Sequence, residues 1–328
     1  MKLATIKNNT LDGQLVMVSR DNSKAVKIPF LPTLQKALEQ WDLMTPKLQK
    51  IYEDLNNNNC SDAFAVNPKD FHSPLPRAYQ WLDGSAYIQH VKLVRKARGA
   101  ELPPTLLKIP LMYQGGSDTF LTPYDDIPFI SDKHGLDFES EVGIITDFVP
   151  MGTKAVNALK HIKLLVIIND VSLRGLIPEE LERGFGFFQS KPSSAFAPFA
   201  VTPDELGNAF REGRIFLPLH THYNGTWFGS PNAGEMHFSF AELIEHAART
   251  RNLSAGTIIG SGTVSNEDES KGSSCLAEKR MLEKINSGEI KTPFMQVGDT
   301  IKIEMFSSEG QNIFGTIEQK VVRSHIYE

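Results

Sequence analysis

The sequence is poor in cysteine and contains no long hydrophobic run. Its 328 residues include two cysteines, Cys60 and Cys275, which are too few for a disulfide framework or a four-cysteine zinc site. No apolar stretch approaches the roughly 20 residues that cross a bilayer, and residues 1–7 lack the apolar run of a signal peptide. We therefore predict a cytoplasmic protein in a reducing compartment, with no membrane partner.

A strong charge of one sign is also missing. The formal net charge is −5, from 34 lysines and arginines against 39 aspartates and glutamates, which argues against a nucleic-acid partner. Gly184-Phe185-Gly186 and Gly260-Ser261-Gly262 both lack the third glycine and the strand–helix–strand setting of a dinucleotide site. These absences leave enzymes and binding proteins for small molecules as the main classes.

The chain is long enough for a small domain followed by a large one. Short strands in residues 1–30 and two helices, beginning at Thr33 and Pro46, predict a small N-terminal domain over residues 1–68. Residues 69–328 are then the predicted catalytic domain. Residues 110–118 are glycine-rich and predict a loop, and the polar, irregular residues 171–199 are typical of a mobile lid.

The residues that carry chemistry begin in the stretch 136–146, which predicts one β-strand. Glu139 and Glu141 are two apart, so their carboxylates should lie on one face, close enough to repel unless a cation lies between them. A solvated edge strand is the competing interpretation. The apolar run 163–168 predicts a buried strand that ends in Asn169-Asp170, which places a carboxylate at the mouth of the core.

Four acids in all stand at strand ends or in loops rich in glycine and aromatic residues. Clusters of carboxylates suit hard cations such as Mg²⁺, Ca²⁺ and Mn²⁺ rather than zinc. His90 follows Asp83 by seven residues, so one loop-to-helix turn could present both a metal ligand and a base. The four candidate metal ligands are Asp83, Glu139, Glu141 and Asp170.

From about Pro74 onward the sequence resembles the fumarylacetoacetate hydrolase family, and the first 70 or so residues resemble the accessory domain of bacterial two-domain members. The resemblance implies an α+β, mostly β fold, a mixed β-roll with a small N-terminal domain, and a homodimer. Four blocks carry it: Phe138-Glu139-Ser140-Glu141-Val142, Asn169-Asp170-Val171-Ser172-Leu173-Arg174, Phe188-Gln189-Ser190-Lys191-Pro192 and Gly260-Ser261-Gly262-Thr263-Val264.

The resemblance also implies roles for single residues. The four acids would hold a divalent metal (Mg²⁺ or Ca²⁺, with Mn²⁺ as a further candidate), and His90 would be the general base. Glu278 is our candidate for the acid that orients this base. Lys191 and Arg174 match positions around the substrate's oxygens, with the choice between oxyanion and substrate carboxylate left open for Lys191. Tyr113 and Thr263 match substrate-binding positions.

The sequence departs from fumarylacetoacetase itself at three places. Ser85 stands where a second tyrosine is expected near Asp83, and the glutamine and tyrosine expected beyond Arg174 are absent at Ile177 and Glu182. The reaction class is therefore better defined than the substrate.

The function implied is a metal-dependent hydrolase that cleaves a carbon–carbon bond in a β-diketo acid, foremost fumarylacetoacetate to fumarate and acetoacetate in tyrosine degradation. His90 would deprotonate a water, with the metal as Lewis acid and Lys191 or Arg174 at the oxyanion. The alternatives are an acylpyruvate hydrolase, an oxaloacetate decarboxylase, a 2-oxo-pentenoate hydratase or isomerase, and a catalytically silent relative that binds a metal and a small acid.

Overall fold

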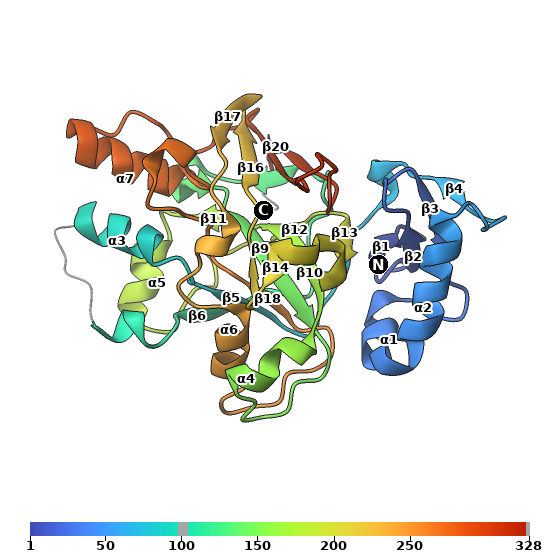
Figure 1. Cartoon of the computed structure of the whole chain (residues 1–328). Helices are drawn as coiled ribbons and strands as arrows, with labels where there is room; N and C mark the ends of the chain where they lie inside the picture. The colour runs from blue at the N-terminus through green and yellow to red at the C-terminus, as the bar shows by residue number, and fades with distance from the viewer. Residues whose placement is uncertain (98–103, 326–328) are drawn as a thin grey trace.

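The computed structural model of the protein describes residues 1–97 and 104–325, apart from the side chains of residues 90, 94–97 and 104. Its centre is an 11-stranded sheet, in which β12 (Ala195–Phe196) pairs with β10 beside the main path (Figure 1). The strand order along that path is β4 (Phe64–Ala65), β3 (Lys24–Lys27), β2 (Gln14–Val18), β1 (Lys2–Ile6), β13 (Phe199–Val201), β10 (Ile162–Asn169), β9 (Ser140–Thr146), β18 (Ile258–Gly260), β5 (Trp81–Gly84) and β6 (Met112–Gly115).

A five-stranded sheet and seven α-helices complete the described part of the fold. The sheet order is β17 (Thr226–Gly229), β16 (Leu219–Tyr223), β19 (Thr300–Met305), β20 (Ile317–Arg323) and β7 (Ile127–Phe129). Two short pairs join β8 (Leu136–Asp137) with β11 (Ser172–Leu173), and β14 (Phe210–Arg211) with β15 (Arg214–Ile215). The helices are α1 (Leu34–Glu39), α2 (Trp41–Asn56), α3 (Ile88–Ala97), α4 (Ala155–Ala158), α5 (Ile177–Arg183), α6 (Phe240–Ala247) and α7 (Leu276–Ser287). None of these helices is both long and apolar enough to cross a membrane.

Strand β10 is buried on both faces, as its continuous apolar run predicts. Side chains alternate between faces of a strand, so Leu165 and Ile167 enter a core shared with the five-stranded sheet. Leu164, Val166 and Ile168 enter a second core, formed with α1 and α2. Full burial of each such side chain contributes about 1.5–3 kcal/mol, so this strand fixes the centre of the fold and the position of the residues that follow it.

The N-terminal residues form a distinct small lobe that nevertheless extends the main sheet. Strand β1 pairs antiparallel with β13, and α1 and α2 lie beside β1–β4 at one end of the molecule (Figure 1). The small N-terminal domain is thus confirmed, while its boundary between residues 68 and 69 stays a prediction. Helix α1 begins as predicted, with the hydroxyl of Thr33 accepting a hydrogen bond from the Lys36 amide at 3.2 Å.

Three local predictions were wrong in detail. Helix α2 begins at Trp41 instead of Pro46, because buried Trp41 and Met44 extend the apolar stripe of Leu48 upstream. Residues 136–146 form two strands, since β8 pairs with β11 and β9 pairs with β10. Residues 112–115 form β6, an edge strand paired with β5, where the prediction was a loop.

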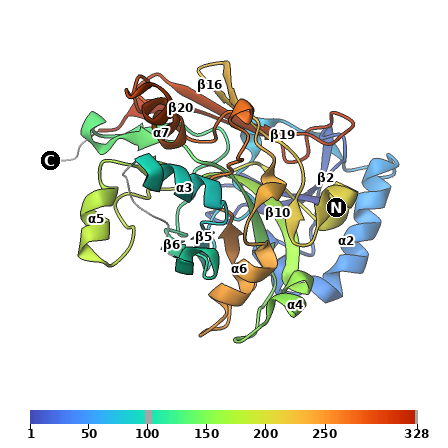
Figure 2. The ribbon, with the colours of Figure 1, turned by 60° about the vertical axis from the view of Figure 1, so that its left-hand side comes forward.

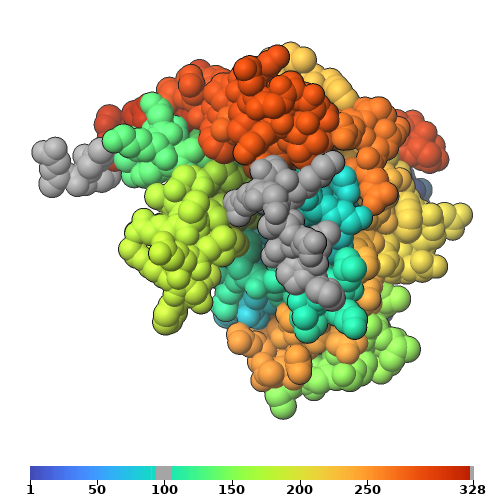
Figure 3. Space-filling model, turned by 90° about the vertical axis from the view of Figure 1, so that its left-hand side faces the viewer, coloured from blue at the N-terminus to red at the C-terminus, as the bar shows by residue number. Residues whose placement is uncertain are grey.

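Helices α3, α5 and α7 lie on one side of the molecule (Figure 2). Helix α3 directly follows β5 and packs against α7. The segment 171–199, predicted as a lid, contains α5. The surface is hollowed between the α5 segment and the segments around α3 and β6 (Figure 3).

Candidate active site

The four acids converge from four places in the main sheet. Asp83 belongs to β5, Glu139 lies in the break between β8 and β9, Glu141 belongs to β9, and Asp170 directly follows β10. Strand β9 pairs with both β10 and β18, and β18 pairs with β5. One carboxylate oxygen from each acid lies within 4.8 Å of the others, and all four side chains are buried. The sheet register therefore creates the cluster from residues far apart in sequence.

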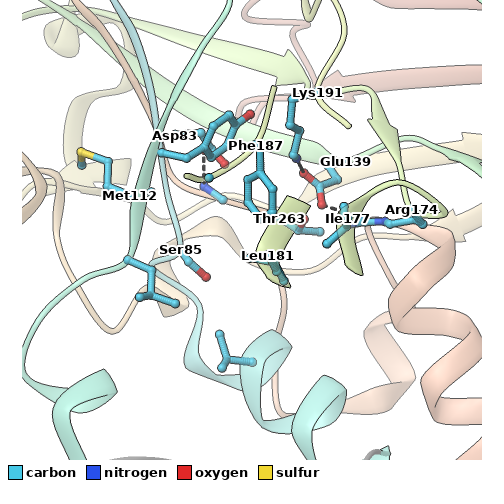
Figure 4. Close-up of a pocket in the computed structure, with 16 residues that line it drawn as sticks. Asp83, Ser85, Met112, Glu139, Arg174, Ile177, Leu181, Phe187, Lys191 and Thr263 are labelled. Atoms are coloured by element: carbon cyan, nitrogen blue, oxygen red, sulfur yellow. Dashed lines mark hydrogen bonds and ion pairs between the residues drawn. The ribbon is translucent and has the colours of Figure 1, made fainter. Parts of the chain in front are cut away.

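Two of these acids are already neutralised by cations of the protein. The ammonium of Lys191 lies 2.6 Å from Glu139 Oε2 and 2.6 Å from Asp170 Oδ2, and it donates to the Ser172 hydroxyl at 2.8 Å. These three bonds use all the donors of an ammonium group. Arg174 adds a second cation, with a guanidinium nitrogen 2.6 Å from Glu139 Oε1. Figure 4 shows Lys191, Glu139 and Arg174 on one side of the pocket.

Asp170 has two further hydrogen-bond donors. The Tyr113 hydroxyl donates to Asp170 Oδ2 at 2.7 Å, and the Ser194 hydroxyl donates to Oδ1 at 2.7 Å. The Lys191 ammonium also lies 5.2 Å from the centre of the Tyr113 ring. Tyr113 thus orients a candidate metal ligand as well as lining the pocket.

Asp83 and Glu141 are in a different position. Within the described residues, no lysine or arginine forms an ion pair with either of them. Both carboxylate oxygens of Glu141 are buried, face the Asp83 carboxylate, and accept no bond from an amide, hydroxyl, lysine or arginine of the described residues. Asp83 Oδ1, in contrast, accepts one bond from the Gly262 amide at 3.0 Å. Two buried carboxylates without a balancing positive charge are costly.

The pKa values show the same imbalance. Burial raises the pKa of Glu141 well above its ordinary range, and the charges of Asp83 and Asp170 raise it further. Burial also raises the pKa of Asp83 well above its usual value, with the charge of Asp170 acting in the same direction. A cation between the two carboxylates would favour their charged forms and act against both upward shifts.

The cluster fits a hard divalent cation. It offers carboxylate oxygens, which Mg²⁺, Ca²⁺ and Mn²⁺ prefer, and one such ion would balance the charges of Asp83 and Glu141, the two acids that form no ion pair with a described lysine or arginine. The unpartnered oxygens of Glu141 are the observation that supports this fit. The assignment of the four acids as metal ligands stays a prediction.

The glycines of the Gly260-Ser261-Gly262 block allow β18 and its following turn to approach Asp83 closely. Gly262 has a φ of +78°, and a Cβ there would lie 2.4 Å from the carbonyl oxygen of Gly84. Only glycine suits this backbone. The same turn aims the Gly262 amide at Asp83 and places Thr263 in the pocket wall.

Arg174 connects the cluster to helix α7. Its Nε donates to Asp137 Oδ2 at 2.9 Å, and Asp137 also accepts bonds from the amides of Leu276 and Ala277 at 2.8 and 2.9 Å. Asp137 therefore caps the first turn of α7, where the helix end carries partial positive charge. Burial still raises the pKa of Asp137, although the Arg174 charge and these amides act against it.

The predicted base and its partner lie on two packed helices. His90 belongs to α3, and its side chain lies outside the described residues, so its role stays a prediction. Glu278 is buried in the first turn of α7, the helix that packs against α3. Glu278 thus stays our candidate for the acid that orients the base.

A pocket of about 580 Å³ opens above the cluster. Asp83, Glu139, Arg174 and Lys191 line one part of it, together with Tyr113, Ser85 and Thr263. From helix α5, Ile177 and Leu181 line the pocket together, because residues four apart lie on the same face of a helix. Glu182, the other position beyond Arg174 at which the family resemblance leads us to expect a pocket residue, is exposed and outside the lining.

Sequence reasoning missed three residues that organise this site: Asp137, Ser172 and Ser194. Asp137 precedes Glu139 by two residues, so the alternation that singled out Glu139 and Glu141 included it as well. Ser172 lies in the block 169–174 that carries the family resemblance, but its role, like that of Ser194, depends on where the chain places Lys191 and Asp170.

Sequence comparison assigns both parts of the chain to known families. Residues 80–322 match the family described as fumarylacetoacetate (FAA) hydrolase C-terminal, and residues 1–77 match fumarylacetoacetase N-terminal domain 2. The oxaloacetate tautomerase YisK of Bacillus subtilis (strain 168) is 25% identical over 77% of this chain and 83% of its own. A 2,4-didehydro-3-deoxy-L-rhamnonate hydrolase of Sphingomonas sp. (strain SKA58) is 27% identical over 49% of this chain, and the match covers about half (55%) of that relative.

The fold is also that of solved structures. Maleylpyruvate hydrolase from Sphingobium sp. SYK-6, in complex with manganese(II) ion and pyruvate, superimposes with a TM-score of 0.64 at 14% identity, covering 99% of this chain and 100% of that one. The confirmed fold is the mixed, mostly β architecture that the sequence motifs implied. With its family match spanning most of its length, the chain belongs to the fumarylacetoacetate hydrolase family.

Proposed function

We propose that the protein is a metal-dependent hydrolase that cleaves a carbon–carbon bond in a β-diketo acid. The main support is the buried four-acid cluster, whose two unbalanced carboxylates call for a divalent cation at the floor of a pocket. We propose Mg²⁺, Ca²⁺ or Mn²⁺ as this cation, and a homodimer as the assembly. Bound there, the cation would act as a Lewis acid that polarises the substrate's oxygens.

The chain's own residues would handle the proton and the developing charge. His90, oriented by Glu278, takes a proton from water, and the water oxygen bonds to the acyl carbonyl carbon. One N–H of Lys191 turns from its carboxylate partner toward the developing oxyanion. The bond to the neighbouring carbon then breaks, its electrons form an enolate, and protonation of the enolate completes a carboxylic acid and a keto acid.

Two substrate types fit this chemistry. Fumarylacetoacetate, from tyrosine degradation, carries a second carboxylate on the tail beyond the diketone, whereas acylpyruvates can carry an uncharged tail. The test is to assay the metal-loaded protein on fumarylacetoacetate, acetylpyruvate and oxaloacetate. We expect metal-dependent cleavage of at least one diketo acid. If the protein, with its metal sites filled, cleaved neither fumarylacetoacetate nor acetylpyruvate, the proposal would be disproved.

Two variants test the assigned roles. His90→Ala should lose turnover by at least 100-fold, the lower end of general-base contributions of about 10²–10⁴, while it keeps its metal affinity. Lys92→Gln is the matched control, since Lys92 lies on the same helix and pairs with exposed Glu267. Near-wild-type turnover in His90→Ala would remove His90 as the base.

Oxaloacetate tautomerisation is the second candidate function, because the relative that covers most of this chain is an oxaloacetate tautomerase. That reaction moves a proton without adding water or breaking a carbon–carbon bond. Interconversion of the keto and enol forms of oxaloacetate, without cleavage of any diketo acid, would favour this function over the hydrolase.

A further inference from the structure

The pocket has two chemically distinct halves. The charged half contains the acid cluster, Lys191 and Arg174, while the remaining wall is dominated by hydrocarbon side chains. These come from three separate segments of the chain: Val91 on α3, Leu111 and Met112 at β6, and Ile177, Leu181 and Phe187 in and after α5. Figure 4 shows Met112, Leu181 and Phe187 around the same space as the charged residues.

The cations in the described lining are already engaged. Lys191 donates to two carboxylates and a hydroxyl, and Arg174 is held between Asp137 and Glu139. A second carboxylate placed against Ile177 and Leu181 would lose water, and both cations of the described lining are already paired with other acids. The same wall would gain free energy from contact with a hydrocarbon chain.

The α5 part of the wall is held in place by one contact between aromatic rings and one carboxylate. The Phe187 ring meets the Tyr113 ring edge-on, with centroids 5.3 Å apart, and Tyr113 is itself tied to Asp170. The Glu180 carboxylate accepts bonds from the amides of Phe188, Gln189 and Ser190 at 3.1, 2.6 and 3.2 Å. The apolar wall is therefore fixed to the acid cluster.

We propose that this apolar wall, with Ile177 and Leu181 at its centre, is a specificity subsite that takes an uncharged hydrocarbon tail and disfavours a second carboxylate. The inference rests on the proposed function and concerns its acylpyruvate substrates, whose 2-oxo acid head would lie at the cluster. It selects acylpyruvates with alkyl tails over fumarylacetoacetate. Leu181, which is 51% exposed, is accessible for such a tail.

A pair of matched 2-oxo acids tests the subsite without turnover. 2-Oxohexanoate and 2-oxoadipate share a six-carbon chain and differ in a terminal methyl group or carboxylate. Titration calorimetry on the Mn²⁺-loaded protein should show 2-oxohexanoate binding at least tenfold more tightly. Two more methylenes, in 2-oxooctanoate, should tighten binding by roughly fourfold each until the wall is covered.

Two variants locate the effect. Leu181→Arg should reverse the preference and bind 2-oxoadipate more tightly than wild type does. Glu182→Gln is the control, because it changes the net charge by the same +1 on the adjacent residue, outside the lining, and should leave the preference unchanged. Similar shifts in both variants would mean that long-range charge, and not the wall, controls selection, and this would overturn the inference.

The outcomes separate the two proposals. Equal or tighter binding of 2-oxoadipate by the wild type, alongside cleavage of diketo acids, overturns the subsite and leaves the hydrolase standing. Absence of binding by both 2-oxo acids overturns the subsite, and if no diketo acid is cleaved either, the hydrolase falls with it.

Discussion

Removal of one acid from the cluster should stabilise the metal-free protein and weaken its stabilisation by metal. In the metal-free protein, the oxygens of Asp83 and Glu141 lie within 4.8 Å of each other. Two full charges at that distance repel by about 3.5 kcal/mol at an effective dielectric constant of about 20. We therefore expect Glu141→Gln to raise the free energy of unfolding of the metal-free protein by up to about 3 kcal/mol.

The pH dependence of this effect follows from the direction of the pKa shifts. Burial raises the pKa of Asp83 and Glu141, so above the ordinary carboxyl pKa of about 4 the folded state binds more protons than the unfolded chain. The contribution of these two groups to the stability of the metal-free wild type should consequently fall as pH rises above about 4. The advantage of Glu141→Gln should therefore be larger at neutral pH than near pH 4, the ordinary carboxyl pKa.

Metal narrows the difference in stability between the two proteins. Free Mn²⁺ at about 100 times its Kd stabilises the folded state by about 2.7 kcal/mol. With about 2.1 cal/mol/K of unfolding entropy per residue over 328 residues, this corresponds to a rise in Tm of about 4 °C. Loss of one carboxylate ligand should weaken binding at least tenfold, which at the same Mn²⁺ concentration leaves about 2 °C.

Scanning calorimetry in chelator and then in Mn²⁺ measures both effects on the same samples. Glu304→Gln is the control, because Glu304 is a buried acid outside the cluster that pairs with Lys302; its Mn²⁺ response should equal that of the wild type. A full Mn²⁺ response in Glu141→Gln, or a marked loss of its metal-free stability, would refute the reasoning about charge balance.

Two further predictions concern the N-terminal lobe and the α5 segment. Burial lowers the pKa of Lys2 to about 8, against about 10.4 when unfolded, so the unfolded chain binds more protons between these values. The free energy of unfolding should rise by up to about 3 kcal/mol as pH increases through this window. Urea unfolding at a series of pH values should show this rise for the wild type and not for Lys2→Met. Parallel pH profiles of the two proteins would contradict the lowered pKa of Lys2. Glu180→Gln should speed amide exchange at residues 188–190 about fivefold, for a loss of about 1 kcal/mol at this partly exposed site. Glu179→Gln is the control, because the Glu179 carboxylate pairs with Arg183, and this variant should leave exchange at residues 188–190 unchanged. Equal exchange rates in both variants would exclude Glu180 as the anchor of residues 188–190.

The parts of the fold that the sequence predicted well are those set by local pattern. Strand β10 follows from its apolar run, and the start of α1 follows from Thr33. The extent of α2 and the existence of β6 were missed because distant partners decide them. Trp41 and Met44 are buried in the core that α2 shares with the main sheet, and β6 exists only through its pairing with β5.

The candidate site was predictable to a similar degree. The four acids could be found because each stands where a strand ends or a carboxylate interrupts apolar residues. Their partners could not, because Lys191 lies 52 residues from Glu139 and 21 from Asp170 in sequence. The three-donor contact of Lys191 exists only once the segment after α5 has folded back over β11. Likewise, Leu181 rather than Glu182 lines the pocket because the α5 helix turns that face inward.

Asp137 holds the acid cluster, which would bind the metal, in a fixed position relative to the helices that carry the predicted base His90 and its partner Glu278. Through its two oxygens it holds the first turn of α7, which carries Glu278, and the guanidinium of Arg174, which in turn contacts Glu139. A displacement of α7 would therefore break a buried charge contact, which costs several kcal/mol when one partner is lost. Helix α7 packs against α3, the helix that carries His90. The Asp137 carboxylate therefore stabilises the first turn of α7 and also fixes the distance between the acid cluster and the two helices that carry the predicted base and its partner.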